Sequence, residues 1–186
     1  MRVVSVFGAS LAISAASWAI TGPSAPAVQL ADGTVYFVQP PRLVEATTTQ
    51  KGTYVWGATY YFTLSVPENA GEPLQQVTFN QAEGTDTVQF ELEDTRSFEG
   101  TRWDKGTKFA LGPVAKDPQT ESISVRFDPP IPPGKTVTIG LRPYQNPRYS
   151  GIYLFGVTAF PAGEKAHAQF LGYGRLHFYS SSDGGF

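Results

Sequence analysis

A polar loop at residues 142–151, with the sequence RPYQNPRYSG, contains residue types that are well suited to binding a partner. Its candidate binding residues are Arg142, Tyr144, Asn146, Arg148 and Tyr149. A guanidinium group donates several hydrogen bonds in one plane, and tyrosine rings anchor interfaces and stack on sugars. The loop is therefore a candidate binding surface. The structural alternative is that the arginines pair with acids such as Asp94 or Glu99, while the tyrosines close one end of the domain.

A second polar stretch covers residues 94–112, DTRSFEGTRWDKGTKFALG, and has no clean hydrophobic period. Its mixed charges and three glycines predict a long loop, with short extended pieces as an open alternative, and long loops often carry function. The candidate binding residues in this stretch are Asp94, Arg96, Glu99 and Trp103. Trp103 could form an aromatic platform for a saccharide, and so could Trp56 with the nearby Tyr54. Packing in the core or at its rim is the alternative for each of these rings.

Acidic residues within this stretch and just before it raise two chemical possibilities, a calcium site and a glycoside hydrolase. The acids concerned are Glu91, Glu93, Asp94, Glu99 and Asp104. Calcium prefers oxygen ligands, but the spacing of these acids matches no calcium-binding motif. Glycoside hydrolysis needs two carboxylates at a fixed separation, which neighbours on one exposed strand do not provide. A solvated strand face explains Glu91 and Glu93 without any ion, and no metal site and no cofactor are predicted.

Other catalytic chemistry has little support in the sequence. The chain has no cysteine and only two histidines, His167 and His177, and no G-x-S-x-G turn is present. A nucleophile activated by histidine and a transition-metal site are both disfavoured. The sequence therefore predicts a protein that is not an enzyme. The alternative that stays open is a carboxylate-dependent hydrolase acting on polymers of the cell envelope.

The elements that must position these residues are short strands. Residues 60–66, 123–127 and 137–141 alternate apolar and polar side chains, which is typical of strands with one buried face. Residues 152–160 are apolar on both parities, which predicts a central strand. The prolines at residues 129–133 exclude a helix there. Seven to nine such strands predict a single all-β, immunoglobulin-like antiparallel β-sandwich, with a jelly roll as the structural alternative.

Three further strand assignments are specific enough to test. Residues 34–38 and 42–47 are separated by Pro40 and Pro41, so this split first strand is expected at a sheet edge. Residues 87–93 are predicted to form a strand. The last strand, within residues 168–179, is expected to have three inward-facing side chains. They are Phe170, Leu176 and Phe178.

The N-terminal residues resemble an export signal. Arg2 precedes an apolar run, and an A-x-A site ends at Ala27, so residues 1–27 are predicted to be a signal peptide. An uncleaved anchor is the alternative. The domain is expected at residues 28–179, and residues 180–186 are expected to form a flexible tail. The predicted location is the periplasm, the cell surface or the medium, with the thylakoid lumen also possible.

The overall composition narrows the classes of partner. The chain has 186 residues and a formal net charge of −2, and it has no cluster of lysine or arginine. Binding to nucleic acid is therefore not expected. The absence of cysteine excludes disulfides. No membrane-spanning segment is predicted beyond the leader.

Four stretches carry a resemblance to a known family. They are YYFTLSVPENAGEPLQQVTF, FELEDTRSFEGT, FDPPIPPGKTVTIGLRPYQNPRYSGIYLFGVTAFPAGE and FLGYGRLHFY. In these the chain resembles a family of small exported cyanobacterial proteins that is classified as a domain of unknown function. The resemblance implies export and a single-domain architecture, and it implies no activity.

Together these features predict a non-catalytic exported β-sandwich that binds a protein or polysaccharide of the cell envelope. Binding is expected at the ends of the sandwich, near residues 142–149 and 94–103. A third hypothesis is a structural subunit that exchanges an edge strand with a partner, for which residues 34–47 are the place to look.

Overall fold

A computed structural model describes residues 28–29 and 32–180 of the chain. The predicted signal peptide, and the predicted tail after residue 180, lie outside the described residues. Within the described residues there is no helix with the length and hydropathy that crossing a membrane requires.

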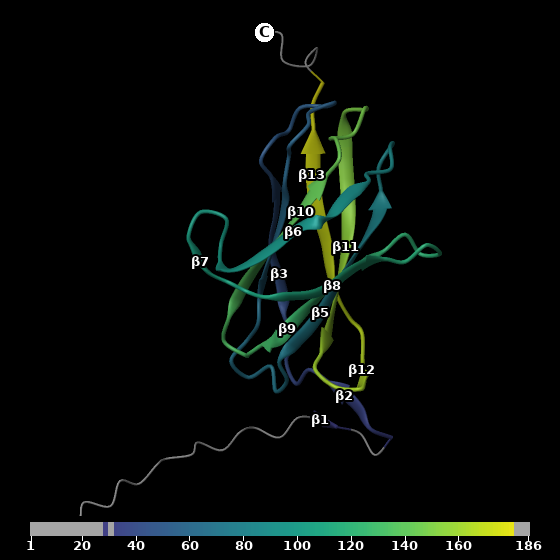
Figure 1. The fold of residues 1–186 in the computed structure, drawn as a ribbon. Coiled ribbons are helices and arrows are strands. Elements are labelled where there is room, and N and C mark those ends of the chain that lie inside the picture. Colours follow the sequence, from purple (N-terminus) through teal and green to yellow (C-terminus); the bar gives the residue numbers. More distant parts are fainter. Residues whose placement is uncertain (1–27, 30–31, 181–186) are drawn as a thin grey trace, which may run out of the picture.

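The chain forms two five-stranded antiparallel sheets packed face to face (Figure 1). In order across the first sheet, the strands are β3 (Arg42–Thr48), β4 (Tyr60–Ser65), β10 (Thr136–Pro143), β6 (Phe90–Gly100) and β7 (Lys105–Lys108). Across the second sheet they are β13 (Gln169–Phe178), β11 (Gly151–Pro161), β5 (Leu74–Glu83), β9 (Ile123–Ile131) and β8 (Leu111–Lys116). The predicted immunoglobulin-like sandwich is confirmed.

A small third sheet lies at the lower end of the molecule in Figure 1. Its strands are β1 (Val28–Gln29), β2 (Thr34–Tyr36) and β12 (Lys165–Ala166). These short elements raise the number of strands in the described part of the chain to thirteen, above the seven to nine predicted. The two halves of the predicted split first strand are β2 and β3, and both were expected at a sheet edge. This is confirmed for β3, which is an edge strand of the first large sheet, and wrong for β2, which lies between β1 and β12.

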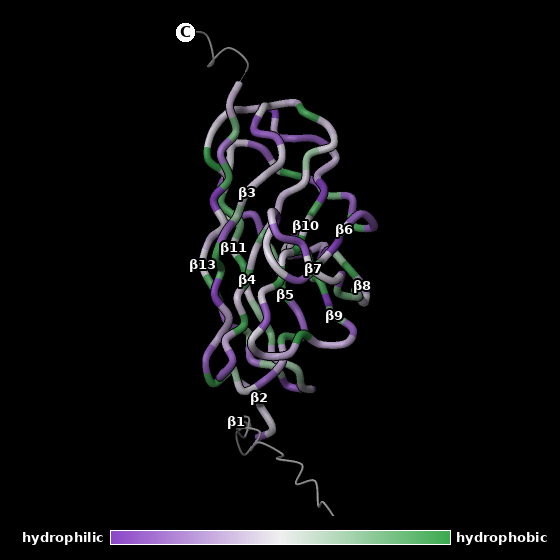
Figure 2. The backbone as a smooth tube through the Cα atoms, turned by 90° about the vertical axis from the view of Figure 1, so that its left-hand side faces the viewer, coloured by the Kyte–Doolittle hydropathy of each residue, from purple (hydrophilic) through white to green (hydrophobic). Residues whose placement is uncertain are grey.

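The core is aromatic and lies between the two large sheets. Apolar and polar residues alternate along the strands (Figure 2), so each strand turns one apolar row inward. At the centre, Phe62 of β4 packs on Phe79 of β5 with ring centroids 4.7 Å apart and on Phe155 of β11 at 6.0 Å. All three rings are buried. Burial of this apolar area is the main stabilising contribution to the fold.

Residues 94–112 were predicted to form a long loop, but most of them lie in strands, so this prediction is wrong. Strand β6 continues to Gly100, a tight turn follows, and β7 and β8 occupy most of the remainder. The left-handed backbone of Gly100, with φ of 89°, and a bond from the Thr101 N–H to the Asp104 carbonyl form the turn. The pairing of β6 with β10 shifts register between Gly140 and Arg142. This irregularity breaks the alternation that would have revealed the strand.

The strand predicted at residues 87–93 corresponds to β6, which starts three residues later, at Phe90. In the last strand, Leu176 and Phe178 are buried as predicted, but Phe170 is 49% exposed. The β11–β13 register shifts by one residue between Gly172 and Phe170, which inverts the parity before that point. Leu171 packs against the core in place of Phe170.

Each of the four outer edges of the two large sheets has a feature that opposes strand addition. Edge strand β3 bulges at Val44, and edge strand β13 bulges beside Gly172. Strand β7 has four residues, all exposed, and carries Lys105 and Lys108. Strand β8 contains Pro113 within a register shift. Bulges, short strands, lysines and prolines are the usual means by which natural sheets avoid pairing with another chain. These edges therefore do not favour the strand-exchange hypothesis.

Candidate functional site

Two loops join to form one end of the sandwich, at the top in Figure 1. They are the β3–β4 loop and the β10–β11 loop, which are far apart in sequence. The Asn146 N–H donates to the Val55 carbonyl at 2.8 Å, and the Tyr54 N–H donates to the Pro147 carbonyl at 3.2 Å. A β-bridge also connects Trp56 with the second loop. Main-chain bonds in both directions make the two loops a single surface.

The buried side chain of Asn146, in the β10–β11 loop, fastens the two loops together through hydrogen bonds to the β3–β4 loop. Its side-chain oxygen accepts a hydrogen bond from the Tyr60 hydroxyl at 3.0 Å, and its Nδ2 donates to the carbonyls of Gln50 at 3.0 Å and Gly52 at 2.8 Å. Burial, together with the nearby Tyr153, raises the pKa of Tyr60 above its usual range, so the phenol remains a donor. Asn146 is 2% exposed. Its side chain holds the two loops together and is too buried to contact a partner directly, which corrects its prediction as a binding residue.

Four large aromatic side chains are more than half exposed on these two loops. They are Tyr54 at 55%, Trp56 at 70%, Tyr144 at 53% and Tyr149 at 52%. We call these four residues together with Arg148 the end surface. Aromatic rings held on fixed backbone lose little conformational entropy when they bind, and they present both an apolar face and, in tyrosine, a polar tip. The end surface combines the loop predicted from residues 142–151 with Tyr54 and Trp56, which were predicted as a separate platform.

The backbone of Tyr54 is constrained in a rare conformation. Its φ is 60°, in the left-handed region that residues other than glycine seldom adopt. Its carbonyl accepts a hydrogen bond from the Gln145 side chain at 2.9 Å, and its N–H donates to the Pro147 carbonyl. Strain of this kind persists only where surrounding contacts enforce it, and it is common at binding sites.

Arg148 is oriented by Asp86, which lies in the β5–β6 connection. Asp86 accepts hydrogen bonds from the Arg148 N–H at 3.0 Å, from Nε at 3.1 Å and from Nη2 at 3.2 Å. The guanidinium also lies 5.8 Å from the centroid of the Tyr149 ring. The side-chain and backbone bonds from Arg148 lower the pKa of Asp86, and the same contacts raise the pKa of Arg148. Sequence reasoning missed Asp86, because its partner is 62 residues away and nothing local indicates the pairing.

This pair gives a prediction for acid pH. The folded chain holds the pKa of Asp86 below its ordinary value of 3.8, so the stabilisation is present above the unfolded pKa and is lost as pH falls through the folded pKa. Asp86→Asn should therefore lower the melting temperature slightly at neutral pH, and the difference from wild type should shrink as the pH falls through the folded pKa of Asp86. Thermal melts of both proteins across this pH range measure the effect. A difference that persists unchanged at the acid end would contradict the proposed ionic contact.

Arg142 does not belong to the end surface. It forms ion pairs with two acids of the neighbouring strand β6, from Nε to Glu91 at 3.0 Å and from Nη1 to Asp94 at 2.8 Å. The structural alternative for this arginine, pairing with Asp94, is therefore what the chain adopts. For Arg148 the partner is Asp86, and neither Asp94 nor Glu99 pairs with it.

Three of the five acids that raised calcium binding and glycoside hydrolysis have basic partners. Glu91 and Asp94 share Arg142, and Glu99 pairs with Lys135 at 2.7 Å. Among the described residues, no group of three or more histidine, cysteine or acidic side chains is placed to hold a metal ion. These acids tie neighbouring segments of the first sheet together.

Trp103 and Arg96 are also separate from the end surface. Trp103 lies in the β6–β7 turn and is stacked by Arg102, whose Cζ is 4.5 Å from the centroid of the indole ring. Arg102 also approaches the Tyr61 ring and donates to the Thr48 carbonyl at 3.0 Å, which holds the turn against the first sheet. Arg96 is exposed on β6. The predicted group at residues 94–103 is therefore distributed along a strand and a hairpin.

Three solved structures resemble this chain at low sequence identity. The C-terminal domain of the Streptococcus pyogenes antigen I/II-family protein AspA is 14% identical, with 72% of this chain and 46% of that chain covered and a TM-score of 0.43. The collagen-binding domain from a Staphylococcus aureus adhesin is 9% identical, with 73% and 97% covered and a TM-score of 0.37. The collagen-binding subdomain ACE19 of the Enterococcus faecalis surface protein ACE is 8% identical, with 71% and 92% covered and a TM-score of 0.40. This chain thus spans less than half of the AspA chain.

Sequence comparison gives a clearer result for family than for activity. No curated protein matches the chain. A family model described as "Protein of unknown function (DUF2808)" matches residues 34–178, which include every strand of the two large sheets.

Proposed function

Since the chain belongs to the DUF2808 family of proteins of unknown function, we propose its function from its own surface: an exported, non-catalytic binding module of the cell envelope. The observation that carries the proposal is the end surface, where four half-exposed aromatic rings lie on two loops that Asn146 fastens together. Family membership agrees with the domain of unknown function predicted from the four stretches of sequence.

A polysaccharide is the partner that this surface suits best. Its rings are tyrosines and one tryptophan, which stack on the apolar faces of sugars while the phenol groups hydrogen bond to hydroxyls. Arg148 adds a planar donor whose orientation Asp86 fixes. A typical protein interface has a continuous apolar centre, whereas here each ring is interspersed with polar loop residues. The proposed ligand is therefore a polysaccharide of the cell envelope.

Export and the lack of catalysis are parts of the same proposal. The leader-like residues 1–27 support an extracytoplasmic location in the periplasm, at the cell surface or in the medium. The ion-paired state of Glu91, Asp94 and Glu99 supports a role without acid–base chemistry at these residues.

Co-sedimentation with insoluble polysaccharides tests the proposal. Purified peptidoglycan, cellulose and chitin serve as probes, and the wild-type chain is expected to bind at least one of them. Trp56→Ala removes the most exposed ring of the end surface and should weaken binding about tenfold, the loss expected for one anchoring residue.

Tyr173→Ala is the matched control, because Tyr173 on β13 is 55% exposed and lies outside the end surface. Its affinity is expected to equal that of wild type. Equal losses in the two variants would contradict the assignment of the surface. Failure of the wild-type chain to sediment with any probe, combined with capture of an envelope protein that Trp56→Ala abolishes, would overturn the choice of polysaccharide.

A further inference from the structure

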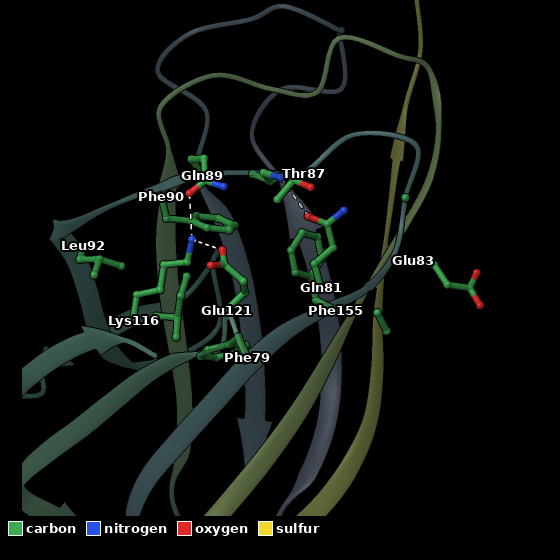
Figure 3. Close-up of a pocket in the computed structure, with 14 residues that line it drawn as sticks. Phe79, Gln81, Glu83, Thr87, Gln89, Phe90, Leu92, Lys116, Glu121 and Phe155 are labelled. Carbon is green, nitrogen blue, oxygen red and sulfur yellow. Dashed lines mark hydrogen bonds and ion pairs between the residues drawn. The ribbon is translucent and has the colours of Figure 1, made fainter. Parts of the chain in front are cut away.

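A cleft of about 330 Å³ opens between the end of β5, the start of β6 and the β8–β9 turn (Figure 3). The rings of Phe79, Phe90 and Phe155 lie around it. Lys116 and Glu121 meet at its mouth, and Gln89 is joined to Lys116 on the same side. The cleft shares no residue with the end surface, and its size is at the lower end of the range for small-molecule sites.

The apolar part of the cleft belongs to the core of the sandwich. Phe79, Ile123 and Phe155 are buried, and Phe90 packs edge-on against Phe155 with centroids 6.0 Å apart. Val88 and Leu92 complete the apolar lining. Phe90 and Leu92 are only half-buried, so an apolar group that covers them removes apolar surface from water on both partners.

The wall formed by the β5–β6 connection is held in place by side-chain bonds. The Gln81 Nε2 donates to the Asp86 carbonyl at 2.6 Å, and its Oε1 accepts from the Val88 N–H at 2.9 Å. Gly84 lies so close to Tyr153 that an added Cβ would be 2.4 Å from the ring. The cleft is therefore formed in the free protein, as in most small-molecule sites.

The mouth of the cleft carries one inward cation. The Lys116 Nζ donates to the Gln89 Oε1 at 3.0 Å and forms an ion pair with Glu121. The lysine side chain is 31% exposed and that of Glu121 is 58% exposed, so the acid is the partner closer to water. An exposed ion pair contributes little, and a competing anion can replace Glu121 at small cost. Glu83, another acid of the lining, points away from the cleft in Figure 3.

Glu121 also occupies a strained position. Its φ is 57°, in the left-handed region where glycine is the favoured residue of a hairpin turn. The turn itself is fixed by Asp117, whose carboxylate accepts from the N–H groups of Gln119 at 2.7 Å and Thr120 at 3.0 Å. A glutamate in this backbone conformation destabilises the folded chain relative to glycine. Its side chain forms an ion pair with Lys116 at the mouth of the cleft.

We propose that this cleft binds a small amphiphile with a single anionic group. The apolar body lies against the half-buried Phe90 and Leu92 at the surface of the cleft, above the buried rings of the core, and the carboxylate or sulfonate binds the Lys116 ammonium in place of Glu121. Two features carry the proposal: a preformed apolar lining, and a single cation at its mouth whose acidic partner is readily displaced.

Fluorescence titration with anilinonaphthalene sulfonate, an aromatic sulfonate, tests the site in the full chain. Wild type is expected to bind the dye, and decanoate is expected to displace it more effectively than the uncharged decanol. Lys116→Gln should weaken dye binding about tenfold through loss of a charge-assisted bond. Glu121→Gly should strengthen binding and raise the melting temperature, because it removes both the competing anion and the strain.

Two control variants separate this result from other causes. Lys108→Gln removes an exposed lysine of β7 outside the cleft and should leave dye binding unchanged. Trp56→Ala should also leave it unchanged, which distinguishes the cleft from the end surface. Equal binding by Lys116→Gln and Lys108→Gln, or displacement by decanol as effective as by decanoate, would overturn the proposal. Absence of dye binding to folded wild type would overturn it as well.

Discussion

Asn146→Ala is expected to lower the free energy of unfolding by about 3 kcal/mol, the cost of leaving several buried polar groups without partners. The substitution removes three hydrogen bonds of the Asn146 side chain at once. It leaves the Tyr60 hydroxyl and the carbonyls of Gln50 and Gly52 without that partner in a buried or part-buried place. Urea unfolding followed by tryptophan fluorescence measures the change.

The same variant should also release the two loops of the end surface from each other. Tyr60→Phe is the graded comparison, since it deletes one of the three bonds and is expected to cost about 1 kcal/mol. Asn80→Ala, at an exposed asparagine of β5, is the control and should be close to neutral. If Asn146→Ala were as stable as Asn80→Ala, the role of Asn146 as the fastening residue would be wrong.

Gly174→Ala is expected to destabilise the chain by about 1–3 kcal/mol, the usual cost of inserting a methyl group into a filled core. A Cβ at Gly174 would lie 2.6 Å from the Cε1 of Phe62 and 2.8 Å from the Cβ of Ala46. Phe62 is packed on other core rings and cannot move away freely. Strands β13 and β3 would have to separate along the side of the sandwich where they meet.

Chemical unfolding of Gly174→Ala beside Gly112→Ala tests this expectation. The nearest atom to a Cβ at Gly112 is 3.7 Å away, on the Arg126 side chain, so that variant should be close to neutral. Adding Ala46→Gly to Gly174→Ala should restore part of the lost stability, because it removes one of the two clashes. An unchanged unfolding midpoint in Gly174→Ala would mean that the two sheets are less closely packed here than the distances indicate.

The fold was predictable wherever strand pairing is regular. In residues 60–66 and 137–141 the alternation continues without interruption, and both segments form central strands of the first sheet. The prediction failed at residues 94–100 and at Phe170, where a bulge changes which side chains face inward. A bulge depends on the register of the partner strand, and that information is not present in the local sequence.

The candidate site was predictable by residue type and only partly by position. Tyr144, Arg148 and Tyr149 lie on the surface as the loop sequence indicated. Asn146 has the same local context, and only the path of the β3–β4 loop decides that it is buried. The joining of Tyr54 and Trp56 to this loop depends on contacts across about ninety residues of chain, as the Gln145–Tyr54 bond shows. No local pattern encodes such a contact.

The guarded edges of the two large sheets have a consequence for how the protein would act on a repetitive polymer. In the described part of the chain, neither large sheet has a long, flat edge open to a second copy, so molecules crowded along the proposed polysaccharide are not expected to pair edge to edge. Each would contribute one small contact through its own end. Retention of the protein on the polymer would then depend on how many repeats are occupied and on any tether between modules, since linked weak contacts bind more tightly together than singly.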